Sequence, residues 1–426
     1  MSANFWMLLS GRVLSNTGAC FYNVSMIWLI YHVTHNTFYT GLTGFLVLMP
    51  MMLQFLVGPL IEKFNKKYLL IATEVGQIMT VIIAFLLYST VWHSVWSLMF
   101  LTPVVAILTM FSNPAEMTLI PEFVNEGKYS AANSLMNVTY QTLTIVFTSL
   151  VGVLLIYFNP LVLYILSTTF NIGAVILFFT MRLSGRLSGR LSGKKRKVDN
   201  LSHRKTIRLM FSEYGQSLVN GIRKVRKFFI LKFLPTTIIA NFVFGMLSAV
   251  LPAYATQRGG SQWYGIYQSA DTMGILIGAI LAPVLQKVPL GKITICGGLF
   301  SCFCWTMSFF SDNNYLSVTL YTASLLFNGI TNILLVSGMQ RAVPKEDLAQ
   351  FFTILTSFGG FAIPFGSLAG GQVAQLWGIV PVFISIGISY LLISVYWLTQ
   401  SILRQMPAVD KLGSGAYSVY SKSSSE

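Results

Sequence analysis

Long apolar stretches alternate along the chain with short polar or basic connections. A helix of about 20 apolar residues spans the ~30 Å hydrocarbon core of a bilayer, so each stretch predicts a transmembrane helix. The pattern therefore predicts an all-α membrane protein with twelve transmembrane helices. The predicted spans are 5–33, 40–61, 68–90, 95–120, 131–157, 160–181, 227–254, 263–286, 290–310, 314–340, 348–375 and 379–402.

The twelve predicted spans form a six-helix unit that is used twice. Thr40-Gly41-Leu42 aligns with Tyr264-Gly265-Ile266 at an offset of 224 residues, and Pro121 aligns with Pro344 at an offset of 223. Between the two sets lies a basic segment with a Leu-Ser-Gly-Arg tandem, which has too little apolar surface to fold and predicts a flexible tether. The predicted organisation is an N-terminal six-helix bundle (1–181), a basic cytoplasmic linker (182–226), a C-terminal six-helix bundle (227–402) and a cytoplasmic tail (403–426).

The positions of the charged residues indicate the membrane topology of the chain. Charged residues are 10% of the chain, whereas a soluble domain carries about 25%, which excludes a soluble protein. Of the 28 Lys and Arg residues, 25 lie in even-numbered connections or the C-terminal tail, and Arg258 is alone in an odd-numbered connection. Basic loops stay cytoplasmic, so we expect both termini to be cytoplasmic in a multi-pass protein of the cell membrane, most simply a bacterial plasma membrane. This asymmetry explains the net charge of +15 without nucleic acid.

The connection after the second span carries a family signature. It reads Gly58-Pro-Leu-Ile-Glu-Lys-Phe-Asn-Lys-Lys-Tyr-Leu-Leu and resembles the G-x-L-a-D-r-x-G-R-R-x-x-L motif of major facilitator superfamily transporters, with Glu for Asp, Lys for Arg, and Asn65 where a second Gly is usual. The resemblance implies the major facilitator fold and a cytoplasmic latch that helps to hold the outward-open state. The alternative is a plain basic turn. The latch positions are Gly58, Leu60, Glu62, Lys63, Lys66 and Lys67.

A narrower resemblance suggests a substrate class. The stretches 111–124, 131–134, 221–227 and 366–371 resemble the macrolide-efflux branch of drug:proton antiporters, and siderophore exporters share much of the pattern. The resemblance implies a multidrug-type efflux antiporter that exports a small amphipathic or lipophilic compound by alternating access. One departure weakens the antiport inference, because the G-P-x-x-G-G element that such exporters carry in span 5 is replaced by Ser149-Leu-Val-Gly152.

Four charged side chains lie in the middle or inner part of predicted spans, where a charge costs at least ~2.5–3.5 kcal/mol at the membrane centre. Arg12, Glu74 and Glu116 fall at one depth of the N-terminal bundle, and Asp271 lies in the outer half of the C-terminal bundle. An apolar environment favours the neutral, protonated form of a carboxyl group, whereas a nearby arginine favours its charged form. We expect Glu74 or Asp271 to carry the coupled proton and Arg12 to pair with Glu116. The alternatives are a structural ion pair, a Glu116 exposed to the cytoplasm, and Arg12 as a substrate ligand.

Neutral polar residues recur at helical spacing within several spans. In major facilitator proteins spans 1, 4, 7 and 10 and their neighbours line the cavity, so the resemblance implies that these side chains face a watery path. Hydrogen bonding between helices is the competing interpretation for any one of them. The substrate-cavity candidates are Asn16, Asn23, Asn137, Tyr140, Gln141, Asn241, Gln268, Asn328 and Asn332.

The sequence contains no phosphate loop, no His-Glu-x-x-His motif and no nucleophile elbow, so no enzyme activity is predicted. We expect no cofactor and no metal. The expected partners are a small-molecule substrate, protons and the lipid bilayer, with no nucleic acid and a monomeric chain. Two other hypotheses stay open at this point. One is an exporter of an endogenous metabolite such as a siderophore or peptide, and the other is a non-transporting receptor or scaffold whose 182–226 segment binds a partner.

Overall fold

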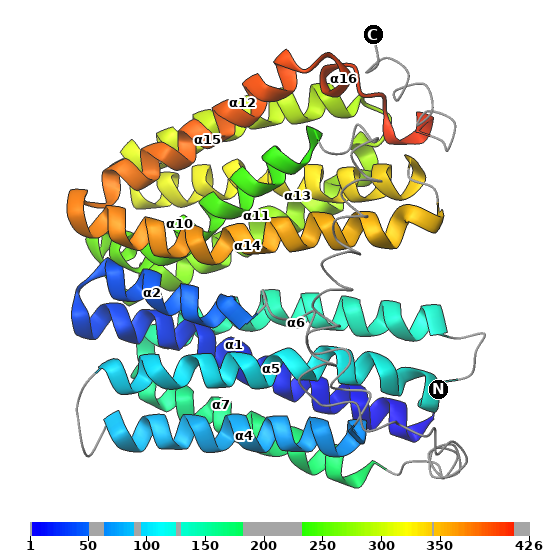
Figure 1. The fold of residues 1–426 in the computed structure, drawn as a ribbon. Coiled ribbons are helices and arrows are strands. Elements are labelled where there is room, and N and C mark those ends of the chain that lie inside the picture. Colours follow the sequence, from blue (N-terminus) through cyan, green and yellow to red (C-terminus); the bar gives the residue numbers. More distant parts are fainter. Residues whose placement is uncertain are drawn as a thin grey trace, which may run out of the picture.

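Every regular element in the described part of the chain is a helix (Figure 1). The computed structural model describes residues 2–50, 64–88, 95–124, 129–181, 232–342 and 345–412. The elements are α1 (Ala3–Thr34), α2 (Thr37–Leu48), α4 (Lys66–Leu86), α5 (Val95–Phe123), α6 (Tyr129–Tyr157), α7 (Pro160–Thr180), α10 (Leu234–Arg258), α11 (Ser261–Leu285), α12 (Leu290–Phe310), α13 (Asn314–Ala342), α14 (Lys345–Trp377), α15 (Ile379–Thr399), α16 (Ser401–Arg404) and the 3₁₀ turn η5 (Val409–Lys411).

Each of the twelve predicted spans overlaps one of these helices, which confirms the all-helical fold. Nine helices in the described ranges are long and apolar enough to cross a membrane. Helix α2 is shorter and is not among the nine, and residues 51–63 after it lie outside the described ranges. The count of twelve crossings and the predicted domain boundaries therefore stay predictions.

The helix ends follow from local sequence chemistry. Asn65 and Asn159 each precede a helix and accept a hydrogen bond from the backbone two residues on, which satisfies one free N–H of the first turn. Pro160 then occupies the first turn of α7, where its missing N–H costs nothing. The turn from α10 to α11 uses Gly259 and Gly260, both with positive φ, a conformation that glycine adopts readily.

The helices form two groups, which we call the N-terminal half (α1, α2 and α4–α7) and the C-terminal half (α10–α16); Figure 1 shows the first below the second. Within the halves, α1 packs on α7, α4 on α5, α10 on α14, and α11 on α13. Between the halves, the main contacts join α2 to α14 and α6 to α11. This arrangement places two helix pairs at the boundary between the halves.

The contacts between the halves gather at the end of the molecule where α1 turns into α2, which we call the α1–α2 end. Glycine backbones meet there in two places, Gly41 with Gly371 and Gly152 with Gly265. Thr37 Oγ1 donates to the Gly371 carbonyl oxygen at 3.0 Å. Without side chains, the four glycines let the helices approach more closely than larger residues would. The described structure is therefore closed at this end.

Candidate functional site

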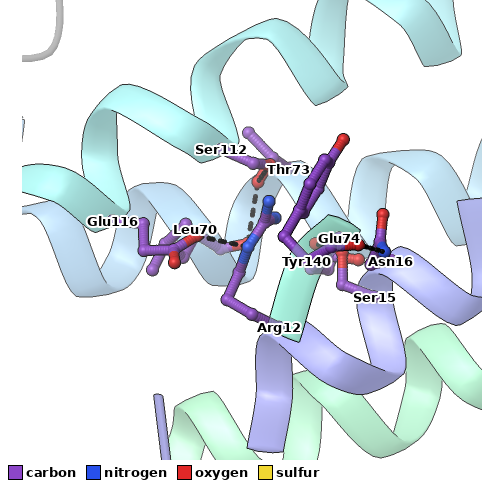
Figure 2. A network of polar contacts seen from close by, with 9 residues as sticks. All are labelled: Arg12, Ser15, Asn16, Leu70, Thr73, Glu74, Ser112, Glu116 and Tyr140. Atoms are coloured by element: carbon purple, nitrogen blue, oxygen red, sulfur yellow. Dashed lines mark hydrogen bonds and ion pairs between the residues drawn. The ribbon is translucent and has the colours of Figure 1, made fainter. Parts of the chain in front are cut away.

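The buried charges of the N-terminal half lie together between α1, α4 and α5 (Figure 2). Arg12 and Glu116 form an ion pair and are each less than a tenth exposed. Glu74 is fully buried, and its Oε1 accepts a hydrogen bond from Ser15 Oγ at 2.7 Å. Glu74 Oε2 has no hydrogen-bond partner among the described residues. The structure thus places the three predicted charges at one level, with one carboxylate oxygen unpartnered.

Hydrogen bonds tie this cluster to the surrounding helices. Asn16 Nδ2 donates to the Tyr140 carbonyl oxygen at 3.3 Å and to Thr144 Oγ1 at 3.1 Å, which links α1 to α6. Thr73 and Ser112 join α4 to α5 through hydroxyl oxygens 3.4 Å apart. Asn16, predicted as a cavity residue, therefore makes the interhelical hydrogen bonds of the competing interpretation.

The fourth predicted charge, Asp271, stands apart on α11. It is partly buried, and its Oδ1 accepts a hydrogen bond from Tyr321 Oη at 3.3 Å. The structure places Asp271 on α11 of the C-terminal half, whereas Arg12, Glu74 and Glu116 are on α1, α4 and α5 of the N-terminal half. Glu74 and Asp271, the two carboxylates predicted to carry the coupled proton, therefore lie at separate sites.

The remaining substrate-cavity candidates differ in their exposure and in their hydrogen-bond partners. Asn23, Tyr140, Asn328 and Asn332 are exposed. Asn328 Nδ2 also donates to Tyr390 Oη at 3.1 Å. Gln268 Nε2 donates to Tyr264 Oη at 3.0 Å, and the Tyr264 ring stacks on Trp28 of the other half, so Gln268 supports the contact between the halves. Two candidates, Asn137 and Gln141, have side chains outside the described residues.

Asn241 is partly buried on α10, where it faces α14, because a side chain at Gly359 would meet its Nδ2. In the described ranges, no three His, Cys, Asp or Glu side chains come together as potential metal ligands.

Comparison with known proteins decides the family. The sequence profile of the Major Facilitator Superfamily matches residues 8–352, most of the chain. The chain belongs to this superfamily. Its members are carriers and not enzymes, so this chain is a transporter of a small-molecule substrate and an integral multi-pass membrane protein.

Sequence and structure relatives agree with this assignment. A relative from Bacillus subtilis (strain 168), described as the uncharacterized MFS-type transporter YvqJ, is 24% identical over 408 residues, covering 90% of this chain and 91% of the relative. The structure of the nucleoside transporter NupG has a TM-score of 0.69 at 11% identity, covering 92% and 98% of the two chains. A D-xylose-proton symporter has a TM-score of 0.68 at 10% identity, covering 95% and 98%. These likenesses establish the major facilitator fold.

The predicted latch of this superfamily member is only partly described. Gly58, Leu60, Glu62 and Lys63 lie outside the described residues. Lys66 begins α4, and Lys67 Nζ donates to the carbonyl oxygens of Phe179 and Met181 at 2.8 and 2.6 Å. A cation at the C-terminal end of a helix donates hydrogen bonds to the free carbonyl groups there and interacts favourably with the helix dipole. Lys67 therefore fastens the end of α7 to the start of α4.

Sequence reasoning missed three polar side chains of this transporter's N-terminal half. They are Ser15, which donates to Glu74, and the buried amides Gln77 and Asn171. A usable signal existed for each. Ser15 is three residues from Arg12 and so lies on the same helix face, and an amide inside a membrane span is costly enough to require a partner or a role.

Proposed function

We propose that this transporter couples proton movement to the export of a small amphipathic or lipophilic compound by alternating access. The observation that carries the proposal is the buried Glu74 beside the Arg12–Glu116 pair. A carboxylate oxygen that is fully buried without a hydrogen-bond partner among the described residues is a natural place for a proton to bind, because protonation turns that oxygen into a neutral hydroxyl. Ionisable groups inside membrane spans are rare and often mark proton or substrate pathways, which supports this role for Glu74.

Alternating access is supported by the contacts between the halves. These contacts gather at the α1–α2 end, where glycine backbones meet in two places and Thr37 Oγ1 donates to the Gly371 carbonyl oxygen. Rocking of the two halves about the central region would separate these contacts and the stack of Trp28 on Tyr264. If basic loops are cytoplasmic, this closed end is the outer one.

The alternative substrate class is an endogenous polar metabolite such as a siderophore or peptide. In that case Arg12 would bind an anionic group of the substrate. The ion pair of Arg12 with Glu116 favours the first proposal, because binding an anion at Arg12 would require the pair to separate at the cost of an unpaired buried charge.

The coupling test compares Glu74→Gln with Asp271→Asn in inverted vesicles and proteoliposomes. Efflux of a substrate panel is measured first in a pump-deficient bacterial host, with and without a proton uncoupler. One proton moving across 100 mV supplies about 2.3 kcal/mol, which sustains roughly a 50-fold gradient of a neutral substrate. We expect Glu74→Gln to abolish uphill transport but keep downhill exchange, and Asp271→Asn to do less. If both variants concentrate substrate as the wild type does, neither residue couples the proton.

The proposed orientation has its own test. A cysteine introduced by Ser192→Cys in the 182–226 segment is expected to resist a membrane-impermeant thiol reagent in intact cells and to react in inverted vesicles. Efficient labelling in intact cells would reverse the topology and with it the assignment of the closed end.

A further inference from the structure

A row of aromatic rings leads from the boundary between the halves to the surface at the α1–α2 end. The Tyr264 ring of α11 stacks on Trp28 of α1, with ring centres 5.0 Å apart. Trp28 also stacks on His32, 6.2 Å away and 18° from parallel. The rings of His32 and His35 then meet edge to face, again with centres 6.2 Å apart. Both histidines are exposed, so the row ends in two accessible imidazoles.

The end of α1 brings these two imidazoles together. Among the described residues, His35 is the only one other than glycine with a positive φ, of 49°. Its N–H donates to the Tyr31 carbonyl oxygen at 2.7 Å, and its ring meets the Tyr31 ring with centres 6.2 Å apart. A left-handed backbone is uncommon for a residue with a side chain, and such residues cluster at functional sites. Each imidazole is thus held by a neighbouring ring, His32 by Trp28 and His35 by Tyr31.

The pair has the chemistry of a metal site. Imidazole is the commonest metal ligand in proteins and suits Ni²⁺, Cu²⁺ and Zn²⁺. An ion lies about 2.0–2.1 Å from each ligating nitrogen, so two imidazoles on one ion have ring centres roughly 4.5–6.5 Å apart. The 6.2 Å between His32 and His35 falls within this range. A stacked ring uses its face, which leaves the nitrogens on its edge free to bind an ion.

Two ligands define the kind of ion and the strength of binding. In the described ranges no third His, Cys, Asp or Glu joins the pair, so water completes the coordination shell. Nitrogen ligands favour the borderline ions over Mg²⁺ and Ca²⁺, which prefer oxygen. A site of this kind binds its ion reversibly and exchanges it with the surroundings.

The row of rings connects the pair to the contact between the halves. Opening at the α1–α2 end would take Tyr264 away from Trp28 and free the Trp28 and His32 rings to change rotamer. The closed state therefore presents the better ordered ligands, and ordering before binding lowers the cost of binding. An ion that binds the closed state more tightly shifts the equilibrium toward it.

We propose that His32 and His35 bind one borderline divalent metal ion such as Ni²⁺, Cu²⁺ or Zn²⁺, and that the bound ion favours closure of the α1–α2 end. The effect on transport rests on the proposed function. Ion binding is measured without transport, so the two can fail separately.

The fluorescence of Trp28 reports on the site, because paramagnetic Ni²⁺ quenches an indole ring that touches its ligand. The purified full-length chain has a tag without histidine and carries His93→Gln and His203→Gln, which leaves His32 and His35 as its only histidines. We expect Ni²⁺ to quench part of the tryptophan emission with saturation, and Trp28→Phe to remove that part. Mg²⁺ should quench nothing, since it prefers oxygen ligands.

Two variants test which side chains hold the ion. His32→Gln and His35→Asn should each raise the Ni²⁺ concentration at half-quenching at least tenfold, since loss of an outer-shell partner alone costs roughly 10–100-fold. Asn tolerates the left-handed backbone, so His35→Asn preserves the end of α1. The matched control is Asn36→Ser, which keeps an oxygen that can cap α2 and should bind Ni²⁺ as the parent chain does.

The link to closure has two measurements. Saturating Ni²⁺ should slow transport in proteoliposomes by about fivefold, the lower end of the usual coupling between two sites. His35→Asn should transport as the parent chain does without Ni²⁺ and should not respond to it. Because coupling is reciprocal, Tyr264→Leu should weaken Ni²⁺ binding although it removes no ligand.

Three outcomes would overturn the proposal. Quenching that does not saturate, or that survives Trp28→Phe, would place the ion elsewhere. An unchanged half-quenching concentration in His32→Gln or His35→Asn would show that the pair does not bind the ion. Saturating Ni²⁺ that leaves the transport rate unchanged would overturn the link to closure. Absence of transport under every condition would instead contradict the proposed function, with the binding measurements unaffected.

Discussion

The N-terminal and C-terminal halves of this transporter follow the same six-helix plan and bury different polar groups. Among the described residues, the buried charged side chains are Arg12, Glu74 and Glu116, all in the N-terminal half. The C-terminal half instead buries hydroxyl groups that satisfy one another: Ser317 Oγ lies 2.7 Å from Tyr267 Oη and donates to the Ser308 carbonyl oxygen at 2.7 Å. The N-terminal half thus buries a cluster of charged groups, whereas the C-terminal half buries a neutral hydroxyl network and keeps its carboxylate, Asp271, only partly buried.

The C-terminal half also holds a packed aromatic cluster. In the C-terminal half Trp305 stacks on Phe383 with ring centres 5.4 Å apart, and its Nε1 donates to the Phe383 carbonyl oxygen at 2.9 Å. Even Arg258, the basic residue of an odd-numbered connection, is held there by the carbonyl oxygens of Ser311 and Phe309 and by the ring of Tyr254. A satisfied network rigidifies its surroundings. The comparison favours the N-terminal half, which buries the charges, as the place where ion binding changes the structure.

The largest expected effect lies at the boundary that the two halves share. Gly152→Leu would place a side chain in the backbone of Gly265, so the halves could not close at the α1–α2 end. We expect transport in proteoliposomes to fall by about tenfold or more. The matched control is Gly360→Leu, because a side chain at Gly360 has open space around it.

The amount of protein inserted in the membrane should be equal in both variants. If Gly152→Leu transports as the wild type does, the glycine contact is not part of the transport cycle. The two halves would then not need to close against each other at this contact.

These boundary glycines show how much of the fold the sequence could predict. Gly41 and Gly265 are the aligned landmarks of the internal repeat, and both meet the opposite half through their backbones. The repeat could identify the two positions because each copy of the unit needs a small residue at the same place. It could not identify their partners, Gly371 and Gly152, because pairing across the halves depends on three-dimensional packing and not on spacing along the chain.

The candidate site was predictable to a similar degree. The cost of a charge in a membrane span was enough to single out Arg12, Glu74 and Glu116 and to expect the pairing of Arg12 with Glu116 that the structure contains. The cavity that Gln77 and Asn171 line was not predictable, because a cavity between helices exists only once those helices have packed.

The second prediction tests the charged half. Glu116→Ala leaves Arg12 buried without its ion-pair partner, and breaking one side of a buried pair costs about 3–5 kcal/mol. We expect this loss in the free energy of unfolding, measured by denaturant titration in micelles. The double variant Arg12→Met with Glu116→Leu should recover most of the loss, because an apolar pair of similar volume replaces the ion pair.

The matched variant in the other half is Asp271→Asn, which keeps an oxygen that can accept from Tyr321 and should cost less than about 1.5 kcal/mol. If Glu116→Ala and Asp271→Asn lower the free energy of unfolding equally, the buried charges of the N-terminal half contribute no more to stability than the carboxylate of the C-terminal half.

The smallest expected effect comes from removing one hydrogen bond to a carboxylate in each half. Ser15→Ala removes the donor to Glu74, at 2.7 Å, and Tyr321→Phe removes the donor to Asp271, at 3.3 Å. A hydrogen bond to a charged group contributes about 1.5–3 kcal/mol and a neutral one about 0.5–1.5 kcal/mol, and the longer bond is weaker. We expect Ser15→Ala to lower the free energy of unfolding by about 2 kcal/mol and Tyr321→Phe by about 1 kcal/mol.

The control repeats Ser15→Ala in a Glu74→Gln background, where the acceptor is an amide. The effect of Ser15→Ala should then shrink to the range of a neutral hydrogen bond, about 0.5–1.5 kcal/mol. An unchanged effect in that background would mean that Glu74 is already neutral in the folded protein, and the contrast between a charged and a neutral half would then rest on the Arg12–Glu116 pair alone.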